Sequence, residues 1–213
     1  MITLGLDPSL TGFGWCVHDS LGTGNGRVIA KGRWVTSPRD IWVARYVQLR
    51  EEIKALIDKE PRIEAVGVES PPFGEQFSEG LYALFVMVNE AIWSRRRDVV
   101  HFDPGTVKML AKQDPRTRKG RMFKSDMIEA AKQDTGIVRW NSDEADAYHI
   151  ARFAGRFWAL LRGDLQLEEL TPSEYQAFAR EHTFVRGKRA GQTEHSGAIF
   201  KEDRRFFRFS SLP

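Results

Sequence analysis

The sequence predicts a mixed α/β fold, in which a five-stranded sheet, three antiparallel strands followed by two parallel ones, is flanked by helices. Three strand-like segments near the N-terminus are joined by tight turns that contain glycine, which is typical of an antiparallel meander. Helical segments then alternate with short apolar segments, and this alternation predicts parallel strands covered by helices.

Each antiparallel strand is bounded by residues that favour turns. Asp7-Pro8 ends the first strand, and Gly12 and Gly14 allow the backbone to turn before the second. A glycine-rich stretch at 22–26 separates the second strand from the third. The three strands are expected at residues 1–6, 13–18 and 27–36.

The remaining elements are predicted from apolar periodicity and from the residues that bound them. Pro61 ends a helix with an approximate 3.6-residue repeat. Ser125 is expected to be the N-cap of one later helix, and Asn141 with Glu144 three residues on resembles a capping box at the start of another. The expected helices are 38–59, 78–97, 104–112, 125–135 and 141–162, and the expected parallel strands are 63–69 and 99–102.

The character of the sequence changes after residue 162. Residues 163–213 have few aliphatic side chains, a Gly-Lys-Arg-Ala-Gly-Gln-Thr stretch and a late Phe-Phe-Arg-Phe cluster. We therefore predict one domain at 1–162 and a C-terminal extension, partly irregular, at 163–213.

Composition excludes several classes of protein. The 213 residues are 41% hydrophobic, which is too much for a wholly disordered chain. Cys16 is the only cysteine, so an internal disulfide and a cysteine-rich zinc site are excluded. The longest apolar run, 81–88, is too short to cross a bilayer, and the N-terminus has no secretory pattern. We expect a cytoplasmic protein that does not enter the membrane.

Four carboxylates lie where an isolated charge is costly. Asp7 and Glu69 each end an apolar strand, and Asp143 and Asp146 share one face at the start of a helix. Asp146 continues the line of the apolar stripe at 150, 153 and 157. A shared divalent cation would remove the cost of burying these groups, and oxygen-only ligands favour Mg²⁺ or Mn²⁺.

Each carboxylate also has a simpler interpretation. Aspartate before proline is common in turns, and a glutamate at a strand end can be solvated. Asp143 and Glu144 stabilise the first turn of a helix through its dipole. Only the four carboxylates taken together favour a metal site over these simpler interpretations.

Three motifs resemble those of RuvC-type Holliday-junction resolvases. They are Leu-Gly-Leu-Asp-Pro-Ser-Leu-Thr-Gly-Phe-Gly-Trp at 4–15, Val-Gly-Val-Glu-Ser at 66–70 and Asp-Glu-Ala-Asp-Ala-Tyr-His-Ile-Ala at 143–151. Their order, spacing and predicted elements match the family over about residues 1–160. Ser9 stands where the family usually has glycine, Pro71-Pro72 stiffens the loop after the second motif, and the tail has no counterpart in the short bacterial enzymes. A phage or other divergent branch would fit these departures, and the location would then be the host cytoplasm.

The resemblance implies a ribonuclease-H-like fold and a homodimer that cuts four-way DNA junctions with paired symmetric nicks. It implies that Asp7, Glu69, Asp143 and Asp146 are the catalytic metal ligands for two Mg²⁺ ions per active site, for which Mn²⁺ can substitute. Asp7 is expected to bridge the ions, and the products to carry a 5′-phosphate and a 3′-hydroxyl.

A basic stretch accompanies the carboxylates. Residues 95–139 include twelve basic and six acidic side chains, a local charge of +6 against +3 for the whole chain. Such a run is often only a solvated surface, but beside a nuclease site it suits contacts to phosphates. Lys108 and Lys124 match basic positions of the family, and Phe73 an aromatic that can stack on unpaired bases. The residues expected to bind DNA are Phe73, Lys108, Arg116, Arg118, Lys119, Arg121 and Lys124.

The helix at 78–97 is apolar around much of its girth, which suits burial against both its own sheet and a partner subunit; a fully buried core helix would have the same pattern. His149 lies one turn past Asp146 and could reach the site, although a lone helix histidine is more often structural. His101 is expected in the core.

Three other functions compete with junction resolution. A sugar kinase or actin-like ATPase shares the first motif but needs a second nucleotide-binding half, for which the chain is too short. A ribonuclease H that acts on RNA–DNA hybrids would have a similar site. A non-catalytic junction-binding module would keep the basic stretch but would have no need of an inward-facing Asp146.

Overall fold

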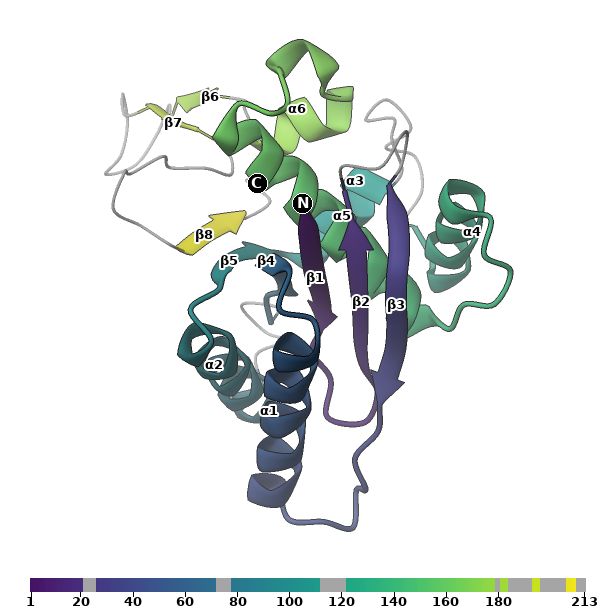
Figure 1. Ribbon diagram of the computed structural model, residues 1–213, viewed down its shortest axis with the longest axis vertical. Helices are drawn as coiled ribbons and strands as arrows, with labels where there is room; N and C mark the ends of the chain where they lie inside the picture. The colour runs from purple at the N-terminus through teal and green to yellow at the C-terminus, as the bar shows by residue number, and fades with distance from the viewer. Residues whose placement is uncertain are drawn as a thin grey trace.

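The computed structural model describes residues 1–20, 26–71, 78–111 and 122–178, together with the backbone of three short strands at 181–183, 193–195 and 206–209. These residues form a central sheet with helices on both faces (Figure 1). The main sheet has the strand order β3-β2-β1-β4-β5-β8. Its strands are β1 (Ile2–Asp7), β2 (Phe13–Asp19), β3 (Arg27–Trp34), β4 (Ile63–Glu69), β5 (Asp98–Phe102) and β8 (Phe206–Phe209).

The predicted sheet is confirmed. β2 is antiparallel to both β1 and β3, whereas β4 is parallel to β1 and β5 is parallel to β4. The structure adds a sixth strand, because β8 pairs in parallel with β5 from the far end of the sequence. A separate two-stranded sheet joins β6 (Glu181–Thr183) to β7 (Thr193–His195).

Helices cover the two faces of the sheet differently. On one face, α1 and α2 pack over the alternate residues Ile2, Leu4 and Leu6 of β1. On the other, α5 crosses β2, β1 and β4, as Figure 1 shows. The helices are α1 (Trp42–Lys59), α2 (Glu79–Ser94), α3 (Pro104–Ala111), α4 (Lys124–Thr135), α5 (Ser142–Arg162) and α6 (Pro172–Phe178), with a 3-10 turn at Leu167–Glu169.

The expected capping box of α5 is confirmed. The Asn141 side chain accepts from the backbone N–H of Glu144 at 2.9 Å, and the Glu144 carboxylate accepts from the N–H of Asn141 at 3.2 Å. The expected Ser125 cap of α4 is wrong, because the helix begins one residue earlier. There Asp126 accepts from the backbone N–H of Phe123 at 2.8 Å, which satisfies a donor that the first turn leaves open.

Two boundaries near α1 also differ from the prediction. β3 ends at Trp34 instead of residue 36, because the Thr36 hydroxyl turns to the Leu10 carbonyl. α1 begins at Trp42 instead of residue 38, because residues 37–40 form a turn closed by the Asp40 N–H and the Ser37 carbonyl at 3.1 Å.

The start of the predicted extension contributes to the core. Phe178 of α6 is fully buried, and its ring centroid lies 5.8 Å from that of Phe157 in α5. Glu174, also buried, binds Arg156 of α5 with one carboxylate oxygen at 2.9 Å from Nη2. The division of the chain at residue 162 stays a prediction. None of the helices in the described ranges combines the length and hydropathy needed to cross a bilayer.

Candidate active site

Asp7 and Glu69 end neighbouring parallel strands. Leu6 of β1 lies opposite Val68 of β4, so the two carboxylates come next at the same edge of the sheet. Side chains alternate between the faces of a strand. Because Leu6 and Val68 face α1 and α2, both carboxylates project from the opposite face, which α5 covers.

Glycines in the strands let the backbone of α5 lie almost on the sheet. A Cβ atom on Gly5 of β1 would lie 2.0 Å from the Ala147 carbonyl oxygen, and one on Gly14 of β2 would lie 2.0 Å from that of Asp143. Since Gly14 is also the register partner of Asp7, the first turn of α5 is held beside that carboxylate. This packing brings Asp143 and Asp146 to the two strand-end acids. Glycines inside predicted strands were the sequence signal for it.

The charges of three of these acids disfavour one another. Burial, followed by the charges of the neighbouring Asp146 and Asp143, raises the pKa of Asp7 to about 7. Burial also raises the pKa of Glu69 well above its usual value, with Asp7 and Asp146 as the next causes. Burial raises the pKa of Asp146 to about 6. Carboxylates that meet in this way gain from a shared cation.

Two lysines oppose this negative charge. Lys108, on α3, lowers the pKa values of Asp7, Glu69 and Asp146, although burial outweighs it. Lys124, at the start of α4, has the same effect on Asp7 and Asp146, and its side chain is 74% exposed. The other expected DNA-binding residues, Phe73, Arg116, Arg118, Lys119 and Arg121, lie outside the described residues.

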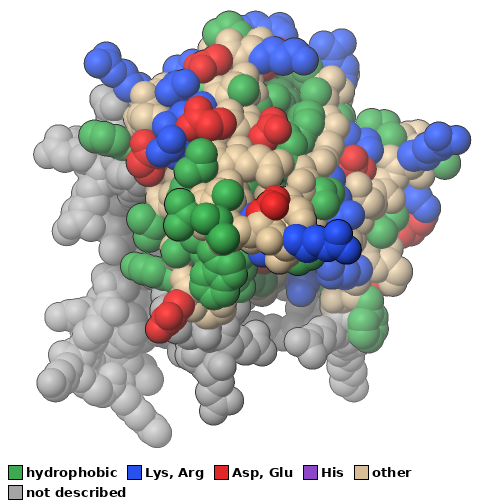
Figure 2. Space-filling view, turned by 90° about the horizontal axis from the view of Figure 1, so that it is seen from below, with side chains coloured by type: hydrophobic (Ala, Val, Ile, Leu, Met, Phe, Trp, Pro, Cys, Tyr) green, Lys and Arg blue, Asp and Glu red, His purple; other side chains and the backbone are tan. Residues whose placement is uncertain are grey.

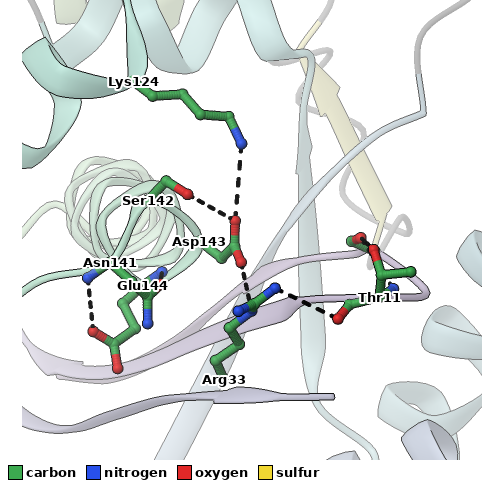
Figure 3. Close-up of polar contacts among 8 residues, drawn as sticks. Thr11, Arg33, Lys124, Asn141, Ser142, Asp143 and Glu144 are labelled. Atoms are coloured by element: carbon green, nitrogen blue, oxygen red, sulfur yellow. Dashed lines mark hydrogen bonds and ion pairs between the residues drawn. The ribbon is translucent and has the colours of Figure 1, made fainter. Parts of the chain in front are cut away.

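Asp143 differs from the other acids because protein groups already satisfy it (Figure 3). Its Oδ2 lies 2.7 Å from Nε of Arg33, and its Oδ1 accepts from the Ser142 hydroxyl at 3.0 Å. The Lys124 ammonium lies 3.9 Å from the same Oδ1. The sequence reasoning missed Arg33, since nothing in a strand at 27–36 points to a contact with residue 143.

The donor atoms of these acids suit a hard divalent cation, but the side chains are not arranged as a preformed metal site. All the donors are oxygens, and Oδ1 of Asp146 is shielded from solvent with no hydrogen-bond partner in the structure described. Within the described ranges, no three acidic, histidine or cysteine side chains form a ready metal cluster. Asp7, Glu69 and Asp146 are the residues that would hold such an ion, whereas one oxygen of Asp143 is already engaged by Arg33.

The two histidines considered from the sequence, His149 and His101, do not belong to this site. His149 is fully buried, its Nε2 lies 3.1 Å from the Met127 carbonyl oxygen, and its ring stacks near Phe153. Burial lowers the pKa of His149 to about 4. His101 is also buried, as expected, and its Nε2 lies 2.7 Å from Oδ1 of Asn89.

Comparison with solved structures identifies the fold. Thermus thermophilus RuvC in complex with a Holliday junction substrate aligns with a TM-score of 0.65 and 23% sequence identity, over 76% of this chain and 96% of that one. The chain has a RuvC-like fold. A second RuvC structure from Thermus thermophilus aligns with a TM-score of 0.62 at 23% identity, over 76% of this chain and 97% of that one. No protein-family model matches the sequence, and no curated protein matches it significantly.

The RuvC-like fold confirms the structural part of the sequence resemblance. The predicted sheet of three antiparallel and two parallel strands is present, and so is the predicted helix that carries Asp143 and Asp146. At 23% identity the comparison concerns the fold alone. The function is therefore argued from the residues at the strand ends.

Proposed function

We propose that the protein is a metal-dependent endonuclease that resolves four-way DNA junctions by paired symmetric nicks. One observation carries the proposal: Asp7, Glu69 and Asp146 converge from three elements of a RuvC-like fold, and their charges destabilise one another. A structural role would not require three carboxylates at one edge of the sheet. A metal site for phosphodiester hydrolysis would.

The carboxylates would hold Mg²⁺, or Mn²⁺ in its place, two ions per site. Asp7 ends β1, which lies between β2 and β4, and the first turn of α5 packs beside it, so it is the group best placed to be shared. When bound, the ions would activate water and stabilise the leaving oxygen, so that cleavage leaves a 5′-phosphate and a 3′-hydroxyl. The protein itself supplies the fixed carboxylates and the nearby Lys108 and Lys124, which favour a phosphate at this edge.

The DNA would lie across the edge where β1 and β4 end. Figure 2, seen from below the view of Figure 1, shows Lys and Arg side chains beside acidic ones, next to a large group of hydrophobic ones. Arg116, Arg118, Lys119 and Arg121 would extend the basic surface, and Phe73 would stack on a base near Glu69. A four-way junction is the proposed substrate because it presents several phosphate backbones to such a surface.

A homodimer through α2 would supply two sites for the two nicks. One side of α2 packs in the core through Leu84 and Val88, whereas Val86 is 52% exposed and Trp93 is 64% exposed. The adjacent α1 exposes Trp42, Val43 and Val47. A partner subunit would bury these apolar side chains, and a C₂ axis would match the approximate symmetry of a junction.

The test uses four labelled substrates: a four-way junction, a linear duplex, an RNA–DNA hybrid and a single strand, each with Mg²⁺ or EDTA. Symmetric nicks in the junction alone, only with Mg²⁺, are the expected result. Asp7→Asn and Asp146→Asn should bind the junction and fail to cut it, and Asp40→Asn, an exposed loop change, should cut normally.

The two rivals give different results in the same assay. Cleavage of the hybrid with an intact junction would identify a ribonuclease H. Binding of the junction with no metal-dependent cutting would identify a non-catalytic module. Wild-type rates for Asp7→Asn would contradict the assignment of the site whatever the substrate.

A further inference from the structure

Arg33 holds one of the four proposed metal ligands. It lies on β3, the edge strand of the sheet, and its Nε is 2.7 Å from Oδ2 of Asp143 (Figure 3). Its Nη2 lies 3.5 Å from the Thr11 carbonyl oxygen, in the turn that follows Asp7. A Cβ atom on Gly12 would lie 2.2 Å from Nη2, so the guanidinium rests against the backbone of that turn.

The two proposed metal ligands on α5 therefore differ in how the protein satisfies their oxygens. Both oxygens of Asp143 have cationic or hydroxyl partners, from Arg33, Ser142 and Lys124. In contrast, Oδ1 of Asp146 has none among the described residues. Because the Arg33 contact is the shortest of the three charged or polar contacts to Asp143, this arginine is the main obstacle to a metal ion at that carboxylate.

We propose that Arg33 competes with the metal ion for Asp143 and, once displaced, binds a phosphate of the DNA at the edge of the active site. This inference rests on the function proposed above and adds a residue to it. Arg33 would hold the empty site in a form that binds metal weakly, and DNA would favour the exchange by giving the guanidinium a new anionic partner.

The position of Arg33 suits such an exchange. Its side chain is 42% exposed, against 16% for Asp143, so the guanidinium can leave without disturbing the core. Arg33 and Lys124 contact the same carboxylate, at the end of the sheet where the DNA is proposed to lie. A guanidinium forms paired hydrogen bonds with a phosphate as readily as with a carboxylate, so both partners use the same geometry.

Metal binding to the protein alone tests the first half. Mn²⁺ is titrated into wild type and Arg33→Gln by calorimetry, without DNA. Loss of a partly exposed ion pair should tighten Mn²⁺ binding by about two- to fivefold. Arg33→Lys, which keeps a charge but loses the planar fork, should fall between them. Arg39→Gln removes an exposed arginine from the loop after β3 and should bind Mn²⁺ as wild type does.

Salt dependence of junction binding tests the second half, with Ca²⁺ in the binding samples and cutting checked in parallel samples that contain Mg²⁺. Arg33→Gln should lower the slope of log affinity against log salt by about one, the value of one lost phosphate contact. Unchanged or weaker Mn²⁺ binding by Arg33→Gln would overturn the competition. An unchanged salt slope would overturn the transfer to phosphate. Neither result depends on cleavage, so the failure of the nuclease proposal would be seen separately, as uncut junction with wild-type protein.

Discussion

Asp7→Asn tests the electrostatics of the site without DNA. The change keeps the shape of the side chain and removes a charge that burial, Asp146 and Asp143 all oppose. In the absence of metal, we expect the variant to be more stable than wild type at neutral pH. This is an unusual result for a residue at the centre of an active site, since most substitutions destabilise.

The size of the effect follows from the pKa of Asp7, which rises from 3.8 to about 7 on folding. Between these pH values the unfolded carboxyl loses its proton and the native one keeps it, so the native state loses stability as the pH rises. At 1.36 kcal/mol per pH unit, the advantage of Asp7→Asn should grow from about 1.5 kcal/mol at pH 5 to about 4 kcal/mol at pH 8.

The assay is urea unfolding followed by circular dichroism, at pH 5 and pH 8 with EDTA and again with Mg²⁺. Mg²⁺ should stabilise wild type and have a much smaller effect on Asp7→Asn. Asp40→Asn, in the exposed loop before α1, is the matched control and should show no such pH dependence. The reasoning would be refuted if Asp7→Asn were less stable than wild type at pH 8 in EDTA. It would also be refuted if the stability difference between variant and wild type were the same at pH 5 and pH 8.

Three further predictions concern the scaffold. Gly5→Ala places a methyl group 2.0 Å from a carbonyl oxygen of α5 and should cost about 3 kcal/mol or more in urea unfolding, whereas Gly80→Ala, with its nearest atom at 3.5 Å, should not destabilise. The pKa of His149 is lowered to about 4, so the unfolded state takes up a proton at a higher pH than the native state does. The unfolding free energy of wild type should therefore fall by up to about 3 kcal/mol between pH 6.5 and pH 4. His149→Gln should lack this pH-dependent loss when unfolding is measured in urea. Arg152→Leu removes the cation 2.8 Å from the partly buried Asp134 and should cost up to about 3 kcal/mol. Most of this loss should be recovered when Asp134→Leu is added, and a double variant as unstable as the single one would count against the ion pair as the cause.

Local patterns in the sequence were enough for most of the fold. Apolar segments bounded by turn residues predicted the strands, the 3.6-residue repeat predicted the helices, and the Asn141–Glu144 capping box is confirmed. Boundaries were less certain where a side chain found a distant partner. Thr36, for example, leaves the predicted strand to bond the Leu10 carbonyl, a contact between segments that no local pattern joins.

The sequence by itself determined which residues carry the proposed chemistry: Asp7 and Glu69 at strand ends, and Asp146 on the inward line of a helix. These positions were predicted from neighbouring residues: two apolar segments that each end in an acid, and the helical repeat that includes residue 146. Only the tertiary structure decided that Arg33 engages Asp143 and that β8 completes the sheet beside β5. Both contacts join segments far apart in the chain, which residue spacing alone does not encode. The Arg33–Asp143 contact also requires the first turn of α5 to pack closely on Gly14 of β2.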